Sequence, residues 1–369
     1  MGIKNLNKIL KKHCSNGIKE INIKDLNGKF VAIDTSIFLY KFSFMGNMIN
    51  SFILQITHLL KNNITPVYLF DGKPTEDKKE LIKERKEKLA QKENDVKDLK
   101  EKKELLKQSI NDLTNSNDDN EETIEKLQKL NLEYKELCVS IGKKEKSCIR
   151  INWSKVKILK EIMEKCNIYY YQCDGETDIY VKEFFKHNLI DYSLTEDLDF
   201  LTHGCNKVLY GYNYKKSILQ CYDLDIILEE LELTQEKFID MCILMGCDYT
   251  STIRKIGTIT AYKLMKQHNN IEEILMEIQT NKKYKKYIPK EDFNHIKARN
   301  MFNLRYEIEV SKKQLRIQTP ECFNELMEQL KEEAVNNKNV NNLIKSFGKI
   351  KKINKKPKNI MMFFNKNKK

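Results

Sequence analysis

The feature that most constrains this chain is a repeated pattern in which a short apolar run ends in a carboxylate. Residues 28–40 read GKFVAIDTSIFLY and residues 67–74 read VYLFDGKP, so an aspartate, Asp34 or Asp71, closes each run. Residues 167–171 and 190–194 form two similar runs, which lead into CDGETD and TEDLDFLTHG. Runs of β-branched and aromatic residues that stop at a turn are typical of buried strands. Each run therefore predicts a strand with acids at its carboxyl end.

Helical stretches, including residues 53–61 and 153–166, alternate with these strands. Alternation of this kind predicts an α/β fold with a doubly wound, mostly parallel sheet. In such sheets the functional site lies outside the carboxyl ends of the strands. The acids occur where that rule places function.

Seven acids follow or adjoin apolar runs. A single aspartate after a strand is usually an N-cap or a turn residue, but seven together are harder to explain in this way. Each close pair of carboxylates would repel by on the order of 1 kcal/mol in water and by more at a lower effective dielectric. We therefore expect bound cations. The seven are Asp34, Asp71, Glu176, Asp178, Asp197, Asp199 and Asp248.

Oxygen ligands without His or Cys favour Mg²⁺ or Mn²⁺ over zinc. Two such ions about 4 Å apart stabilise the attacking and leaving oxygens of a phosphodiester displacement. The chemistry that we expect is hydrolysis with two Mg²⁺ per site, which Mn²⁺ can replace.

The charge balance points to a polyanionic partner. The chain has 66 Lys+Arg against 53 Asp+Glu, a net charge of +13. Such an excess favours nucleic acid through counterion release. A general bias towards Lys, Asn and Ile is the alternative source of part of the excess.

Ten cysteines occur without a CxxC pair, which predicts reduced thiols in an intracellular protein. The first residues lack the apolar core of a signal peptide, and no segment approaches 18 uninterrupted apolar residues. We expect a soluble monomer with no membrane contact.

Residues 78–150 differ in composition, being rich in Lys, Glu and Leu with no Pro. Two heptad runs, around Leu99 and around Tyr134, flank the turn sequence NSNDDN. They predict two long helices paired as a hairpin. After Glu333 the chain has no acid, and eleven lysines follow from Lys338 onward, which predicts a basic tail.

At this point the residues resemble a known family. MGIKNL, VAIDTSIFLY, VYLFDGKP, CDGETD, TEDLDFLTHG, LMGCDY and IRKIG occur in the order and approximate spacing of the flap endonuclease/XPG superfamily. The resemblance extends from Met1 to about Leu343, apart from the hairpin distal to Lys88. It implies a PIN-like nuclease core with a helical arch insertion and a helix–two-turn–helix module that binds duplex DNA.

The resemblance also implies roles for individual residues. Asp34, Asp71, Glu176 and Asp178 would serve the metal beside the scissile phosphate, and Asp197, Asp199 and Asp248 mainly the second. Other residues match DNA contacts, with a solvated lysine or a core tyrosine as the alternative readings. These are Lys78 and Lys83 (or Arg85) at the phosphate, Tyr40 as a base-stacking residue, and Gly2 as a small residue beside the DNA.

In IRKIG, the resemblance implies that Arg254, Lys255 and Gly257 face duplex phosphates, with K⁺ held by loop carbonyls. Lys255 replaces a glycine of the usual pattern. In the tail, Ile360, Phe363 and Phe364 match the apolar positions of a sliding-clamp-binding segment, although Pro357 replaces the usual glutamine.

We therefore expect a structure-specific endonuclease that cuts 5′ flaps and other branched DNA in replication and repair, in the nucleus or a viral replication compartment. A 5′–3′ exonuclease, a junction resolvase and a non-catalytic scaffold for branched nucleic acid remain alternatives. The expected division is residues 1–95 and 151–235 for the core, 96–150 for the arch, 236–310 for the duplex-binding module and 311–369 for the extension and tail.

Overall fold

The computed structural model describes residues 2–73, 79–115, 120–305, 338–339 and 342–343. Two compact units make up the chain. The hairpin unit is Lys79–Ile151, and the sheet unit is Met1–Lys78 together with Asn152–Lys369. Within the described residues, no helix is both long and apolar enough to cross a bilayer.

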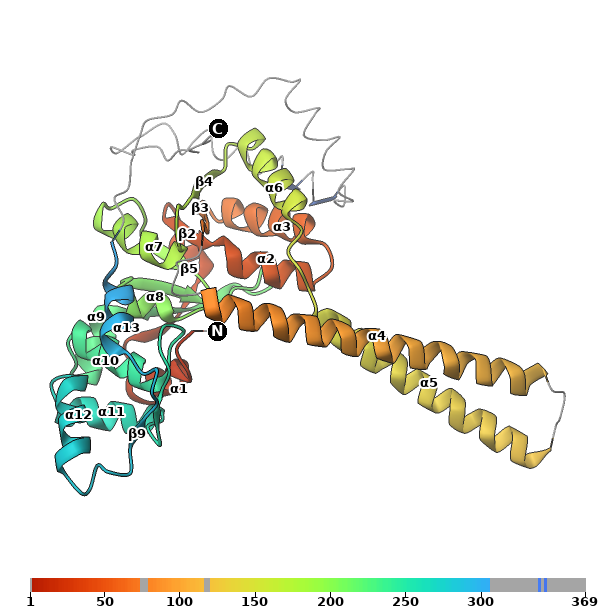
Figure 1. Ribbon diagram of the computed structural model, residues 1–369. Coiled ribbons are helices and arrows are strands. Elements are labelled where there is room, and N and C mark those ends of the chain that lie inside the picture. Colours follow the sequence, from red (N-terminus) through yellow and green to blue (C-terminus); the bar gives the residue numbers. More distant parts are fainter. Residues whose placement is uncertain (1, 74–78, 116–119, 306–337, 340–341, 344–369) are drawn as a thin grey trace. The chain divides into compact units, whose positions relative to one another are not determined.

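A seven-stranded sheet forms the centre of the sheet unit (Figure 1). Its order is β1-β7-β6-β5-β2-β3-β4. The run from β6 to β4 is parallel, and β7 joins its edge antiparallel to both β6 and β1. This confirms the predicted mostly parallel sheet. The strands are β1 (Ile18–Asn22), β2 (Phe30–Asp34), β3 (Thr65–Phe70), β4 (Tyr169–Gln172), β5 (Tyr192–Leu194), β6 (Lys207–Tyr210) and β7 (Ile218–Asp223).

The strand order reverses beside β2. The chain runs from β2 to β3 and β4 on one side, then returns to add β5 and β6 on the other. Such a switch point leaves a crevice outside the carboxyl ends of the two diverging strands, because the connections leave in opposite directions. Asp34 ends β2, and the segment that contains Asp197 and Asp199 follows β5. The predicted acids therefore lie at the switch point.

Helices pack on both faces of this sheet. The described helices of the sheet unit are α1 (Leu6–His13), η1 (Ile23–Leu26), α2 (Thr35–Phe44), α3 (Met48–Lys61), α6 (Trp153–Lys165), α7 (Thr177–Lys186), α8 (Asp199–Thr202), α9 (Leu224–Leu231), α10 (Gln235–Met245), α11 (Thr258–Gln267), α12 (Ile271–Thr280) and α13 (His295–Asn303). A short second sheet pairs β8 (Ile253–Arg254) with β9 (Ile288–Pro289).

Alternate residues of β3 serve the two faces, as a strand's period of two requires. Val67 and Leu69 join an apolar core that also contains Phe184 of α7 and Met241 of α10. Tyr68 packs against α3 instead: its hydroxyl donates to Gln55 Oε1 over 3.1 Å. The centre of the sheet is thus a buried middle layer, which explains why β2 and β3 are almost continuously apolar.

The same core extends into the helical part α10–α13, where Met265, Ile274 and Phe302 are buried in it. These helices therefore belong to the sheet unit rather than to a separate module. The division at residue 236 expected from sequence stays a prediction. α10 packs against α8 as well as against α11 and α13.

In the hairpin unit, α4 (Lys79–Asn115) and α5 (Glu121–Ser147) pair along their length (Figure 1). Val96, Leu137 and Ile141 are buried between them. Lys100 pairs with Glu145 at 2.6 Å and Lys102 with Glu133 at 2.9 Å, as expected for antiparallel helices. No Pro or Gly interrupts α4 between Lys79 and Asn115, and the expected boundary of the arch at residue 96 stays a prediction.

Candidate functional site

Six of the seven predicted acids lie at or just after the carboxyl ends of the parallel strands, or at the start of the helix that follows. Asp34 ends β2, Asp71 follows β3, and Glu176 and Asp178 begin α7 after β4. Asp197 and Asp199 follow β5, while Asp248 comes from the loop after α10. Three of them, Asp34, Glu176 and Asp199, are buried.

Asp34 has two functions that the structure makes visible. Its Oδ1 accepts a hydrogen bond from the Ile37 amide over 3.4 Å and so caps α2, as a lone aspartate in this position often does. Its Oδ2 accepts one from Thr195 Oγ1 over 2.8 Å. Burial, and then the charge of Asp71, raise the pKa of Asp34 to about 7. A cap alone gives no reason to bury a carboxyl beside another carboxylate.

Asp71 is held by the loop that follows β4. Its Oδ1 accepts hydrogen bonds from the amide and the hydroxyl of Thr177, over 2.9 and 2.6 Å. The Gly72 amide donates to the Gly175 carbonyl over 2.7 Å, and a Cβ on Gly72 would lie 2.2 Å from the Asp174 backbone. Only glycine permits this approach, which brings the DGKP and CDGETD segments together.

Glu176 and Asp178 extend from the start of α7. Glu176 Oε2 accepts a hydrogen bond from the hydroxyl of buried Tyr249 over 3.2 Å. Asp178 Oδ2 lies 3.9 Å from Nε2 of buried His203. Burial, with the charges of Glu176, Asp178 and Asp199, raises the pKa of Tyr249. The charges of acids at the starts of α7 and α8 thus raise the pKa of the same tyrosine.

Asp199 is the most enclosed acid of the second group. Its Oδ1 accepts a hydrogen bond from the Ile3 amide over 2.6 Å, and its own amide donates to Asp197 Oδ1 over 3.1 Å. Burial raises the pKa of Asp199 well above its usual range, and the charges of Asp197 and Asp248 add to that rise. Asp34 also responds to the charge of Asp197, so the two groups of acids form one electrostatic cluster.

The N-terminal residues lie against this cluster. Gly2 has φ +86°, and a Cβ there would lie 2.2 Å from Asp197 Oδ1 and 2.7 Å from Asp199 Oδ1. The sequence-based reading of Gly2 required a small residue beside DNA. In the structure a nearer reason exists, since the carboxylates themselves exclude a side chain.

The donor set of the cluster suits a hard divalent cation, because it consists of carboxylate oxygens whose charges oppose one another. Across the described residues, no three His, Cys, Asp or Glu side chains are arranged so that they could already hold an ion. Asp71 accepts a hydrogen bond from the Thr177 hydroxyl, and Asp197 accepts one from the Asp199 amide. The assignment of individual acids to metals stays a prediction.

Tyr40 is 53% exposed at the carboxyl-terminal half of α2, together with Phe44 and Met45. Its exposure rules out the core-tyrosine reading and leaves its ring free to stack. Lys83 and Arg85 are exposed on α4 in the hairpin unit. Lys78, Ile360, Phe363 and Phe364 lie outside the described residues. The roles of all these residues stay predictions.

The IRKIG loop places its basic residues outward. Arg254 and Lys255 are exposed between buried Ile253 and Ile256. Lys255 adopts φ +67°, the left-handed conformation that a glycine supplies most easily. Lys255 thus adopts the left-handed backbone conformation that the usual glycine would adopt, although it carries a side chain. Gly257 is the N-cap of α11, with no protein atom within 4 Å of where its Cβ would lie.

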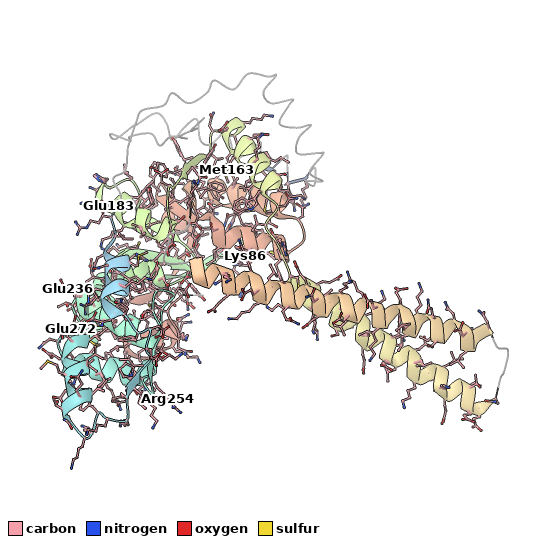
Figure 2. All side chains as sticks on the ribbon, in the orientation of Figure 1. Lys86, Met163, Glu183, Glu236, Arg254 and Glu272 are labelled. Atoms are coloured by element: carbon pink, nitrogen blue, oxygen red, sulfur yellow. The ribbon has the colours of Figure 1, made fainter. Side chains whose placement is uncertain are left out.

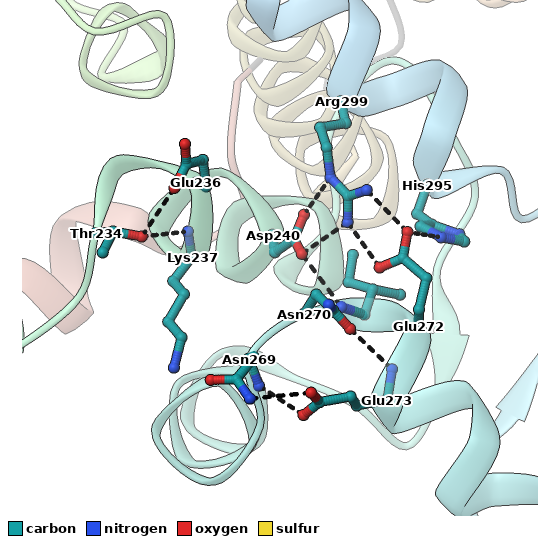
Figure 3. Close-up of polar contacts among 11 residues, drawn as sticks. Thr234, Glu236, Lys237, Asp240, Asn269, Asn270, Glu272, Glu273, His295 and Arg299 are labelled. Carbon is teal, nitrogen blue, oxygen red and sulfur yellow. Dashed lines mark hydrogen bonds and ion pairs between the residues drawn. The ribbon is translucent and has the colours of Figure 1, made fainter.

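A hydrogen-bonded clamp fixes the helices behind this loop (Figure 3). Arg299 of α13 donates to both oxygens of buried Asp240 on α10, over 2.9 and 2.8 Å, and to both oxygens of Glu272 on α12, over 2.8 and 3.0 Å. The Ile271 amide also donates to Asp240, over 3.2 Å. A bidentate guanidinium of this kind sets the relative position of three helices.

Sequence reasoning missed the residues that orient the acids. Thr195 and Thr177 hold Asp34 and Asp71, and Tyr249 contacts Glu176. Each stands inside a motif already singled out and is the direct neighbour of an acid in the sequence. Their residue type gave a signal, since hydroxyl groups beside paired acids are natural hydrogen-bond donors, but their partners are distant in sequence.

Comparison with known proteins yields a consistent set of matches. Residues 1–92 match the XPG N-terminal domain and residues 167–248 the XPG I-region. Flap endonuclease 1 of Xiphophorus maculatus is 30% identical over 320 residues, covering 82% of this chain and 74% of that protein.

Two solved structures share the fold. The catalytic core of Rad2 in complex with DNA substrate is 18% identical, with a TM-score of 0.66 and coverage of 94% of this chain and 100% of that one. The Holliday junction-resolving enzyme GEN1 in complex with product DNA, Mg²⁺ and Mn²⁺ is 13% identical, with a TM-score of 0.51 and coverage of 88% and 67%.

Proposed function

Because the chain belongs to the flap endonuclease/XPG family, we propose that it is a structure-specific nuclease that cuts branched DNA carrying a free 5′ flap. The observation that carries the proposal is the electrostatic cluster of seven acids at the carboxyl edge of the sheet, in which Asp34 and Asp199 are buried beside other carboxylates. Burying like charges together is costly unless the site serves a cation.

We assign Asp34, Asp71, Glu176 and Asp178 to the ion beside the scissile phosphate. Asp197, Asp199 and Asp248 would mainly hold a second ion. Bound Mg²⁺, or Mn²⁺ in its place, would supply stabilisation of the attacking and leaving oxygens of the phosphodiester.

The protein's own groups keep the acids in position for this role. Thr195 and Thr177 each donate a hydroxyl hydrogen to an acid, and the Ile3 amide donates to Asp199. Thr177 lies in the first turn of α7, Thr195 directly follows β5, and Ile3 precedes α1. They limit the directions in which the carboxylates can turn, so that little reorganisation is needed when a cation and a phosphate arrive.

DNA would be recognised by shape rather than by sequence. The loop with Arg254, Lys255 and Gly257 would contact the duplex backbone, with K⁺ at its carbonyls, since exposed cations and an open glycine suit phosphates. Tyr40 would stack on a base near the cut, and Lys78 with Lys83 or Arg85 would contact the scissile phosphate. The hairpin unit would form the arch that admits a single strand.

Other readings predict different products. A 5′–3′ exonuclease releases short products from an end, and a junction resolvase cuts four-way DNA. A non-catalytic scaffold binds without cutting, but it has no need for seven mutually repelling acids. We further propose that Ile360, Phe363 and Phe364, which match the apolar positions of a clamp-binding segment, bind a sliding clamp. We also propose that the protein acts in a nucleus or a viral replication compartment.

End-labelled flap, gapped and four-way substrates test this directly. In Mg²⁺ we expect one main product cut at the base of the 5′ flap, and no product in EDTA. Cleavage that survives in EDTA would contradict the metal-dependent mechanism. A ladder of short products, or preferential cutting of the four-way substrate, would favour one of the sister activities instead.

A further inference from the structure

Residues 281–290 read NKKYKKYIPK, with five lysines and no acid. All five lysine side chains are exposed. Within the part of the chain that the structure describes, none of the five lies in ion-pair contact with a carboxylate. The hairpin unit differs in this respect, since its Lys100, Lys102 and Lys144 pair with acids of the opposite helix. The cationic charge of residues 281–290 is thus not neutralised locally.

The backbone of this segment is fixed at both ends. Tyr284 is buried, and its hydroxyl lies 3.1 Å from His268 Nε2. One turn leads into Tyr284, closed by the Tyr284 amide on the Asn281 carbonyl at 3.0 Å. A second turn follows, closed by the Tyr287 amide on the Tyr284 carbonyl at 2.9 Å. Lys286 Nζ lies 5.1 Å from the Tyr287 ring centre. The lysine side chains therefore extend from a backbone that these contacts hold in place.

This segment adjoins the loop already proposed to contact duplex. Strand β9 pairs with β8 so that Ile288 lies opposite Arg254, and Lys255 follows directly. A groove of about 650 Å³ lies at this pairing. Its lining includes Thr252, Arg254 and Lys290, and also the acids Glu291 and Asp292. Figure 2 shows Arg254 at one end of the sheet unit, the end where β9, α11 and α12 lie in Figure 1.

We infer that residues 281–290 are a second backbone-binding strip for duplex nucleic acid, continuous with Arg254 and Lys255. The inference rests on the proposed function, and it adds Lys282, Lys283, Lys285 and Lys286 to the duplex-binding surface. When lysines that pair with no carboxylate contact phosphates, counterions condensed on the nucleic acid are released. This release gives affinity without sequence preference. A run of lysines that served only solubility would need neither the Tyr284 anchor nor the strand pairing.

The test is the salt dependence of duplex binding. A variant with Lys282→Gln, Lys283→Gln, Lys285→Gln and Lys286→Gln is compared with the unchanged chain on a blunt duplex by fluorescence anisotropy. Each lost phosphate contact removes about 0.9 from the slope of log K against log salt, so the slope should become shallower by about 2 to 4. Affinity at about 50 mM salt should fall at least tenfold.

A matched control removes the same charge elsewhere. Lys19, Lys24, Lys157 and Lys216 are exposed in the sheet unit outside the proposed DNA contacts, and their change to Gln should leave the slope unchanged. An equal effect in both variants, or none in either, would overturn the inference. If the first variant fails to fold by circular dichroism, Lys285→Gln with Lys286→Gln is used instead, and its slope should be shallower by about 1 to 2.

Cleavage by the unchanged protein separates this inference from the function on which it rests. A protein that cuts flaps but whose lysine variant keeps the original slope would contradict the second strip alone. If the unchanged protein cuts no flap but the lysine variant shows a shallower slope of log K against log salt, the proposed nuclease function is contradicted. Residues 281–290 then remain a duplex-binding surface.

Discussion

The Ile3 amide donates a hydrogen bond to Asp199 Oδ1 over 2.6 Å, although 196 positions separate the two residues. This contact places the N-terminal residues against the candidate metal cluster. It also means that the chain's second residue is enclosed by carboxylates, since a Cβ on Gly2 would lie within 2.7 Å of both Asp197 and Asp199.

Gly2→Ala should therefore impair cleavage while leaving the fold intact. The new methyl group must displace Asp197 or Asp199, and a misplacement near 1 Å in an active site costs on the order of 10²-fold in rate. Single-turnover cleavage of a 5′ flap measures this. Gly28→Ala is the control, because Gly28 also has a positive φ of +76° but no atom within 4 Å of a new Cβ. Equal rates for the two variants would show that the space around Gly2 is irrelevant.

Lys255→Gly should stabilise the protein and weaken its hold on duplex. The left-handed conformation costs a residue with a side chain roughly 1 kcal/mol, which glycine does not incur. We expect the free energy of unfolding in urea to rise by up to about that amount. Duplex affinity, measured by anisotropy, should fall because a cation is lost beside Gly257. A variant that binds duplex as tightly as the original would exclude Lys255 from the interface.

Glu272 should contribute to acid sensitivity. Hydrogen bonds from Arg299 are the main cause that lowers the pKa of Glu272 from 4.5 to about 2. Because the folded pKa is depressed, the stabilisation is present above 4.5 and is lost as pH falls from 4.5 through about 2. The stability difference between the original protein and Glu272→Gln should shrink over that window in urea titrations. Glu291→Gln, outside the clamp, should show no such trend.

Residues 99–132 should be dispensable for the fold. The hairpin unit is compact by itself, and its most buried side chains, Val96, Leu137 and Ile141, lie outside this stretch. Replacing it by a short linker should give soluble protein whose main thermal transition is unchanged within a few degrees. Insoluble protein, or loss of the transition, would show that the distal hairpin packs against the sheet unit.

Local pattern accounts for much of what could be predicted. The strands around Asp34 and Asp71 were visible because buried parallel strands are apolar on both faces, and an acid after such a run marks its end. The heptads around Leu99 and Tyr134 were visible because helical pairing repeats every seven residues. In each case the information lies within about ten residues of chain.

What pattern could not predict depends on distant partners. Nothing near Gly2 in sequence indicates that Asp197 lies above it, and nothing in LTEDLD indicates that Thr195 turns to Asp34. The share that α10 to α13 take in the common core is set by packing alone, which no local pattern of the sequence indicates.

Asp199→Asn tests the central claim most directly. Asparagine keeps the shape and an oxygen that can accept from the Ile3 amide, but it removes a charged ligand. With a labelled 5′ flap in Mg²⁺, the variant should cut at least 10³-fold more slowly than the original chain, as expected when a site loses the charge that holds its ions. Its binding of the same flap in Ca²⁺ and its unfolding midpoint should be retained. Cleavage at the original rate would contradict the account, because the acid cluster would then not be the catalytic centre.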